Sequence, residues 1–177
     1  MAREYTFSWP VRRLALLGLA GVAVFGTSII ALHLTGSGVG WTDDYVSDLA
    51  NQPFGWLFMV GGFAHGGGNL ALALGLRGAL RPGRWRTWAV TLLGLASVGI
   101  LLVALFPVEA PGQAPSVSGQ LHRAAASTAF ALELAALFVF SAAFRRQRVW
   151  RRRRAVSLAL SAIAATALTV FVIAIQL

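Results

Sequence analysis

The sequence predicts an all-α integral membrane protein with five transmembrane helices, and three observations support this fold class. The chain of 177 residues is 57% hydrophobic and only 12% charged, whereas a soluble domain carries roughly a quarter charged residues. Five apolar runs are each long enough to cross a hydrocarbon core ~30 Å thick. The arginines are concentrated between alternate runs. One helical bundle uses the whole length, so we expect a single domain over residues 1–177.

Each apolar run must form a helix, because lipid offers an exposed backbone no hydrogen-bond partner. The first run follows Arg12 and Arg13, as a signal peptide would, but it is too long for a signal sequence, so we expect a retained helix. Pro53 suits the first turn of the second helix, Pro107 ends the third, and Ser118 is the predicted N-cap of the fourth. The predicted helices are Val11–Leu34, Gly55–Leu76, Thr87–Phe106, Leu121–Phe144 and Ala155–Leu177.

The arginines predict the orientation of the chain. In a five-helix topology 14 of the 15 basic residues fall on one side, which the positive-inside rule makes cytoplasmic. These are Arg3, Arg12, Arg13, Arg77, Arg81, Arg84, Arg86, Arg145, Arg146, Arg148, Arg151, Arg152, Arg153 and Arg154. We therefore expect a multi-pass protein of the cell membrane, with a cytoplasmic N-terminus and an external C-terminus. The two outer connections, 35–54 and 107–120, hold Asp43, Asp44, Asp48 and Glu109.

Composition excludes several functions. The chain has no cysteine, which rules out disulfides and thiolate chemistry, and no lysine, which rules out Schiff-base chemistry. The net charge of +9 does not indicate a nucleic-acid partner, because the arginines flank apolar runs instead of lining a soluble surface. Exclusive use of arginine, with abundant alanine and glycine, is typical of a GC-rich bacterial genome.

Two ionisable residues are predicted near the membrane midplane. His65 is ten residues into the second run, which is ~15 Å of depth, and Glu133 is twelve residues into the fourth, also near the midplane. Asn69 follows His65 by one turn, on the same face. Ionisable groups at such depth face the bundle interior and need partners, so we expect His65 and Glu133 to meet. Their contact fits a polar clamp between helices or a relay for protons or substrate, and both interpretations stay open.

Glycines surround His65 on the second predicted helix. Gly62 and Gly66 have the small-x-x-x-small spacing that lets another helix approach closely. We expect a tightly packed seam at this position.

A second candidate site lies at the outer ends of the helices. Three segments reach the same predicted interface: Ser47-Asp48-Leu49, Phe106-Pro107-Val108-Glu109 and Gly119-Gln120-Leu121-His122. The helix macrodipole disfavours an imidazolium at a helix N-terminus, so His122 tends to be neutral and able to act as a base or metal ligand. Interface capping by each residue is the alternative interpretation. We expect Asp48, Glu109 and His122 to converge on one outward pocket as candidate catalytic residues, with Ser47 at the edge and His33 nearby.

These three segments resemble the motifs of a bacterial and archaeal membrane family known as domain of unknown function 998. Members of that family show Ser-(Asp/Glu)-Leu after the first helix, then Phe-Pro-x-(Asp/Glu), and then Gly-x-x-His. The resemblance covers residues 12–145. The family often has six helices, whereas this chain offers five, and the resemblance implies no established activity.

The chain is more distantly similar to the CREST-type membrane hydrolases, which carry a Ser, an Asp and three His around a membrane-embedded zinc. It offers Ser47, Asp48 and three histidines, but it lacks the late His-x-x-x-His pair of that group. No cofactor is therefore predicted, although a zinc site is left open.

The leading hypothesis is a membrane protein that binds a lipid or other amphiphile at an outward-facing polar site. The first alternative is an acid–base or metal-assisted membrane hydrolase. The second is a small transporter or structural subunit, with His65, Asn69 and Glu133 as ligand-binding residues of a polar path. Membrane lipids are the expected partners, together with a second copy of the chain or another membrane protein as open alternatives.

Overall fold

The computed structural model describes residues 8–36, 38–41, 44–145 and 147–174, and all regular structure within these ranges is helical. The all-α fold class is confirmed. The elements are α1 (Trp9–Leu34), the 3₁₀ helix η1 (Val46–Asn51), α2 (Trp56–Ala79), α3 (Arg84–Leu105), α4 (Val117–Phe144), α5 (Arg148–Arg151) and α6 (Arg154–Ala174). The predictions made for Arg3, Asp43, Arg146 and the last helix end at Leu177 lie outside the described residues.

Four helices are long and apolar enough to cross a membrane: α1, α2, α3 and α4. Helix α6 is also apolar, but the part of it that qualifies, Arg154–Val170, is shorter. The described part of the chain therefore supports four membrane-spanning helices, and the fifth predicted span stays a prediction.

The fourth predicted helix begins earlier than the sequence suggested. Ser116, not Ser118, is its N-cap, since the Ser116 hydroxyl accepts a hydrogen bond from the Gly119 backbone N–H at 3.0 Å. The hydroxyl of Ser118 instead donates to the carbonyl of Pro107 at 2.8 Å. The predicted cap was wrong because the preceding loop folds back and supplies Ser118 with an acceptor.

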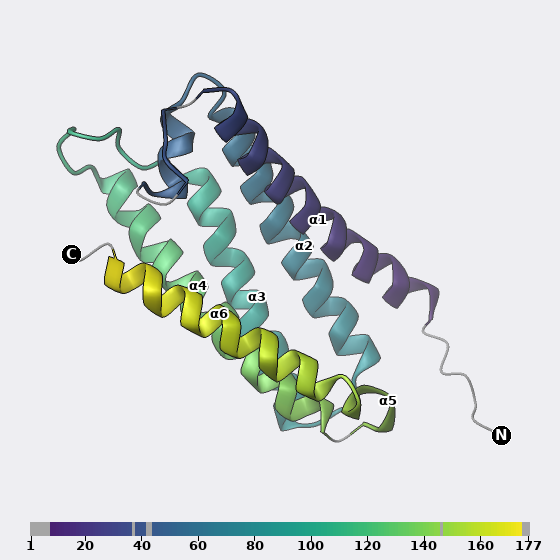
Figure 1. Cartoon of the computed structure of the whole chain (residues 1–177). Helices are drawn as coiled ribbons and strands as arrows, with labels where there is room; N and C mark the ends of the chain where they lie inside the picture. The colour runs from purple at the N-terminus through teal and green to yellow at the C-terminus, as the bar shows by residue number, and fades with distance from the viewer. Residues whose placement is uncertain (1–7, 37, 42–43, 146, 175–177) are drawn as a thin grey trace.

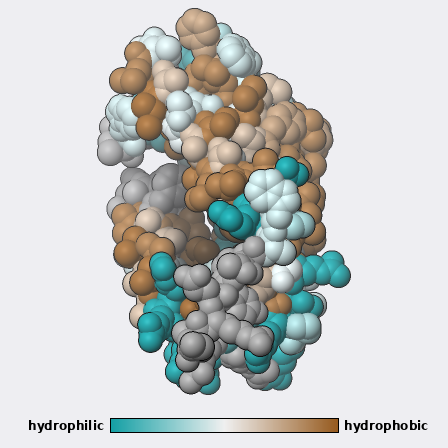
Figure 2. Space-filling model, turned by 90° about the vertical axis from the view of Figure 1, so that its right-hand side faces the viewer, coloured by the Kyte–Doolittle hydropathy of each residue, from teal (hydrophilic) through white to brown (hydrophobic). Residues whose placement is uncertain are grey.

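The helices pack in chain order, with α1 against α2, α2 against α3, α3 against α4, and α4 against α6 (Figure 1). The connections 35–55 and 106–116 lie at one end of the bundle, here called the acidic end. The connections 80–83 and 145–153 lie at the other end with the start of α1, here called the arginine end. Figure 2 shows one face, on which apolar side chains dominate the middle and hydrophilic ones gather towards the arginine end.

Two clusters of buried apolar residues hold the ends of the bundle together. The cluster towards the arginine end contains Ala73, Leu80, Ala89, Leu93, Ala136, Phe140 and Ala143. The cluster at the acidic end contains Leu32, Leu49 and Phe58 and joins η1 to the helices. Because η1 contributes Leu49 to this cluster, the first outer connection is fixed against the bundle.

Helix α2 is close-packed on two sides through glycines. Gly62 and Gly66 face α3, and an ideal Cβ on Gly62 would lie 2.9 Å from the Cβ of Ala104. On the other side, an ideal Cβ on Gly21 of α1 would lie 2.9 Å from the Cα of Gly68. The predicted glycine seam is therefore confirmed, and its partner is α3.

Candidate functional site

Three polar side chains meet halfway along the helices, and we call them the polar cluster: His65, Asn69 and Glu133. The Asn69 amide nitrogen donates to Glu133 Oε1 at 2.9 Å and lies 3.4 Å from His65 Nε2. The distance from His65 Nε2 to Glu133 Oε1 is 3.8 Å, which is an ion-pair distance and too long for a good hydrogen bond. The predicted contact between the two ionisable residues is confirmed, with Asn69 as the bridge.

The helices place these groups with little freedom. His65 and Asn69 are one turn apart on α2, so they share a face. The imidazole of His65 also stacks on the ring of Phe25 from α1, with centroids 5.0 Å apart. Glu133 comes from α4, which packs against α3 and α6, whereas α2 packs against α1 and α3. The cluster therefore ties together two helices that are not direct neighbours in the packing order.

The polar cluster is not sealed from its surroundings. Asn69 is buried at 4% exposure, whereas the His65 and Glu133 side chains keep 19% and 26% of their surface exposed. His65 is the tenth residue of α2, which places it ~14 Å from the helix start at ~1.5 Å per residue. Ionisable groups with open surface at such depth are expensive in lipid unless a polar partner meets them.

At the acidic end, His122 is fixed by a backbone carbonyl. Its Nδ1 lies 2.7 Å from the carbonyl oxygen of Phe106, and its side chain is almost fully buried at 3% exposure. A carbonyl oxygen can only accept, so Nδ1 carries a hydrogen, and in the neutral form of the ring the lone pair lies on Nε2. A neutral imidazole held in this tautomer is suited to act as a base or a ligand through Nε2.

The carboxyl group of Asp48 lies close enough to His122 to interact with it electrostatically. Burial raises the pKa of Asp48 above its ordinary 3.8, and the negative charge of Asp44 acts in the same direction. A backbone hydrogen bond from Tyr45 opposes this rise, and so does the positive charge of the His122 ring when that ring is protonated. Two of the three predicted catalytic residues are therefore electrostatically coupled.

Glu109 is engaged with its own loop. One carboxylate oxygen accepts from the backbone N–H of Ser116, and the other accepts from Arg123 at 2.9 Å. These hydrogen bonds, with that of Ser116 first in size, lower the pKa of Glu109 from 4.5 to about 2. The side chain of Glu109 is 10% exposed, whereas that of Arg123 is 51% exposed. Glu109 thus closes the loop before α4, and its convergence with the other two residues on one pocket stays a prediction.

The comparison with protein families places the chain. The model of the family described as "Protein of unknown function (DUF998)" matches residues 19–176. The chain belongs to this family. The match contains all three motifs on which the resemblance depended. No curated protein and no solved structure matches the chain significantly, so the similarity to CREST-type hydrolases stays a prediction.

The remaining predicted site residues of this DUF998 member have local roles or contacts. His33 Nδ1 donates to the Ile29 carbonyl at 2.9 Å, and its ring stacks on Trp41 with centroids 3.9 Å apart. Ser47 lies in η1 beside Asp48. Within the described ranges, no group of three or more His, Asp or Glu side chains is arranged to hold a metal ion.

Sequence reasoning on the DUF998 chain missed two partners of its site residues. Arg123 pairs with Glu109, and it is the one arginine that the topology placed away from the other fourteen, which was a signal. The Phe106 carbonyl orients His122, because Pro107 ends α3 there and leaves last-turn carbonyls without a helical partner.

Proposed function

We propose that this protein binds the polar group of an amphiphile within the membrane, at the polar cluster of His65, Asn69 and Glu133. The observation that carries the proposal is the exposed quarter of the Glu133 side chain beside a buried Asn69. Both contacts of the carboxylate within the cluster go to Oε1, and we assign Oε2 to the donor of the ligand. A ligand with an N–H or O–H donor and an apolar tail can donate a hydrogen bond to the carboxylate while its tail lies among the lipid chains.

The proposal places the amphiphile deeper than the outward-facing site that the sequence suggested. At the acidic end, both carboxylate oxygens of Glu109 already accept hydrogen bonds from Ser116 and Arg123, so this carboxylate has less capacity to bind a ligand. In the bundle middle, Asn69 donates a hydrogen bond to Glu133 Oε1, and an ammonium or hydroxyl group of the ligand donates a further one to the carboxylate. Imidazole and carboxylate together also accept a proton from such a ligand, which links this site to the transporter alternative.

A pair of matched amphiphiles tests the proposal. Dodecylamine presents N–H donors, whereas dodecyltrimethylammonium has the same chain and charge but no donor. We expect dodecylamine to raise the melting temperature of the detergent-solubilised wild type and not of Glu133→Gln. Ser97→Ala is the control variant, because Ser97 is fully buried on α3 and donates only to its own helix, to the Leu93 carbonyl at 2.7 Å. Equal shifts with both amphiphiles, or in both variants, would contradict donor recognition by Glu133.

A second candidate function, acid–base hydrolysis, is favoured by the tautomer of His122. With Nδ1 held by Phe106, Nε2 is the nitrogen that accepts a proton from water in the proposed reaction, and Asp48 lies near enough to stabilise the charge that develops on the ring. Water would add across an ester bond and release an acid and an alcohol. We expect phospholipid vesicles containing wild type, and not His122→Asn, to release fatty acid. His33→Asn is the control, and equal release from the two variants would exclude this role of His122.

We further propose that the arginine end faces the cytoplasm and that α6 forms a fifth membrane span. The arginine count at the two ends supports this orientation. The chain has no cysteine, so single cysteines can be introduced on a clean background. We expect a membrane-impermeant maleimide to label intact cells with cysteine at position 44 or 109 and not at position 81 or 151. Labelling at position 81 would reverse the proposed orientation.

A further inference from the structure

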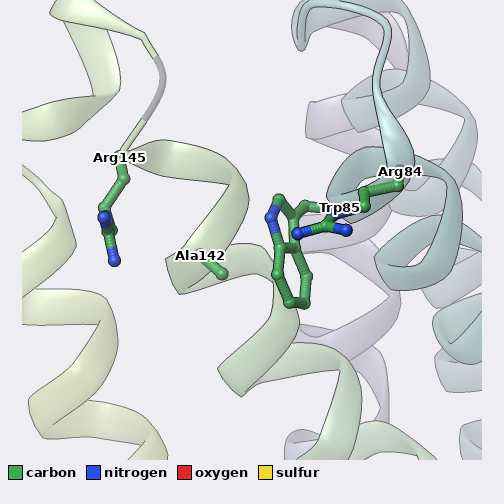
Figure 3. Close-up of a pocket in the computed structure, with 4 residues that line it drawn as sticks. All are labelled: Arg84, Trp85, Ala142 and Arg145. Carbon is green, nitrogen blue, oxygen red and sulfur yellow. The ribbon is translucent and has the colours of Figure 1, made fainter.

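A cavity opens at the arginine end, between the start of α3 and the end of α4. It has a volume of about 340 Å³ and is lined by Arg84, Trp85, Ala142 and Arg145. Figure 3 shows the two arginines on opposite sides, with the small Ala142 between them and the Trp85 ring beside the Arg84 guanidinium. The Arg84 guanidinium carbon lies 5.0 Å from the centroid of the Trp85 ring. The cavity is thus lined by three residues with hydrogen-bond donors, Arg84, Trp85 and Arg145, and by the small apolar Ala142.

The local electrostatics are unfavourable without an anion. Arg84 is the first residue of α3, where the helix macrodipole is already positive, and the first turn of α3 contains no acidic residue. A positive side chain at this position is repelled by the helix terminus. Arg145 adds a second positive charge directly after α4. Because Arg145 follows a helix C-terminus, where a positive charge is favoured, the repulsion lies at Arg84, and an anion beside the two guanidinium groups relieves it.

Among the residues that the structure describes, the neighbouring surface adds positive charge and no negative charge. A smaller cavity beside the first is lined in part by Arg81, Arg86 and Gln147. Arg86 is used structurally, since its guanidinium donates to the carbonyls of Arg77 and Leu80 at the end of α2. The acidic residues that the structure describes all belong to the acidic end or to the polar cluster in the middle. They are Asp44, Asp48, Glu109 and Glu133.

We propose that the cavity between Arg84 and Arg145 binds a phosphate group. Guanidinium groups match phosphate oxygens with two parallel hydrogen bonds each, and a site built only from donors selects an anion with several acceptors. Anionic lipid headgroups lie at the depth where arginines flank membrane helices, and free phosphate carries the same chemistry. This site is separate from the polar cluster and does not depend on the amphiphile proposed there.

Binding measurements on the full chain in detergent test this site. The probe is dioctanoyl phosphatidic acid, and dioctanoylglycerol is the control because it differs by the phosphate alone. We expect Arg84→Gln and Arg145→Gln each to weaken phosphatidic acid binding about tenfold, the loss of a charged hydrogen-bonding partner. Arg151→Gln, which removes an exposed arginine that lines neither cavity, is expected to weaken it less than about twofold. Ala142→Leu fills the cavity without changing the charge and is expected to weaken binding as the arginine variants do.

The outcomes separate a built site from general attraction and identify the source of the phosphate. If the three arginine variants lose affinity equally and Ala142→Leu loses none, the positive end attracts anions diffusely and the proposal fails. It also fails if dioctanoylglycerol binds as tightly as phosphatidic acid. If inorganic phosphate displaces the lipid at similar concentration, the site recognises free phosphate. If inorganic phosphate does not displace the bound phosphatidic acid, and the variants weaken binding as expected, the site recognises a lipid headgroup.

Discussion

Replacing Gly62 with leucine is expected to force α2 and α3 apart. An ideal Cβ at Gly62 would lie 2.9 Å from the Cβ of Ala104, whereas carbon atoms in contact prefer ~3.5–4.0 Å. The first added carbon alone therefore requires a separation of roughly 0.6–1 Å, and leucine adds three more carbons. Overpacking of this kind costs about 1–3 kcal/mol of folding free energy. Asn69 lies on the same helix, so the displacement also stretches its 2.9 Å hydrogen bond to Glu133.

The matched control for this substitution is Gly67→Leu on the same helix. An ideal Cβ at Gly67 meets no atom within 4 Å, so leucine there projects into open space. Helix propensity favours leucine over glycine by up to about 1 kcal/mol, and the change is expected to be neutral or stabilising. The two variants differ only in which side of α2 receives the same side chain.

Thermal unfolding in detergent, followed by far-ultraviolet circular dichroism, compares the variants. At about 2–4 °C per kcal/mol for a chain of this size, Gly62→Leu is expected to melt several degrees below wild type. Gly67→Leu is expected to melt at or above the wild-type temperature. A Gly62→Leu protein that is as stable as Gly67→Leu would refute close packing of α2 against α3.

Three other predictions concern the polar side chains. The loss of unfolding free energy in the double variant Asn69→Ala/Glu133→Ala should be smaller than the sum of the losses in the two single variants, by about 0.6–1.7 kcal/mol. A double-mutant cycle of unfolding measures this difference, and strict additivity would argue against the contact. The pKa of Glu109 is lower in the folded protein than in the unfolded chain, so the ionised carboxylate stabilises the fold. The stability advantage of wild type over Glu109→Gln should therefore be complete above pH 4.5 and disappear as the pH falls to about 2. An ideal Cβ at Gly119 collides with the Glu109 carboxylate, so Gly119→Ala should displace that carboxylate from its hydrogen bonds. The melting temperature of Gly119→Ala should then depend on acid pH as weakly as that of Glu109→Gln, whereas the wild-type pH dependence would place the carboxylate elsewhere.

The helices and the two ends of the bundle could be predicted from the sequence because hydropathy and charge are local properties of a segment. The runs of apolar residues predicted α1, α2, α3 and α4 to within a few residues at each boundary. The spacing of His65 and Asn69 placed both on one face of α2, since one turn of helix separates them. The depth of Glu133 in its own helix then indicated its partner.

Other features depended on contacts between segments that are distant in the sequence. The loop after α3 decides that Ser116 caps α4, because Pro107 takes the hydroxyl of Ser118. The same loop directs Glu109 to Arg123, whereas its motif alone suggested a partner at His122. No pattern within one segment contains this information.

The sequence by itself determined that 14 of the 15 arginines gather at one end and that four of the six acidic residues lie at the other. Only the tertiary structure decided that Arg84 and Arg145 line one cavity, and that Asn69 bridges His65 to Glu133 while leaving the carboxylate partly open. The physical reason is that the position of a residue in an apolar run gives its depth in the membrane, because a helix rises ~1.5 Å per residue. Which side of the helix meets a neighbour is set by packing, here by glycines that let α1 and α3 approach α2 from two sides.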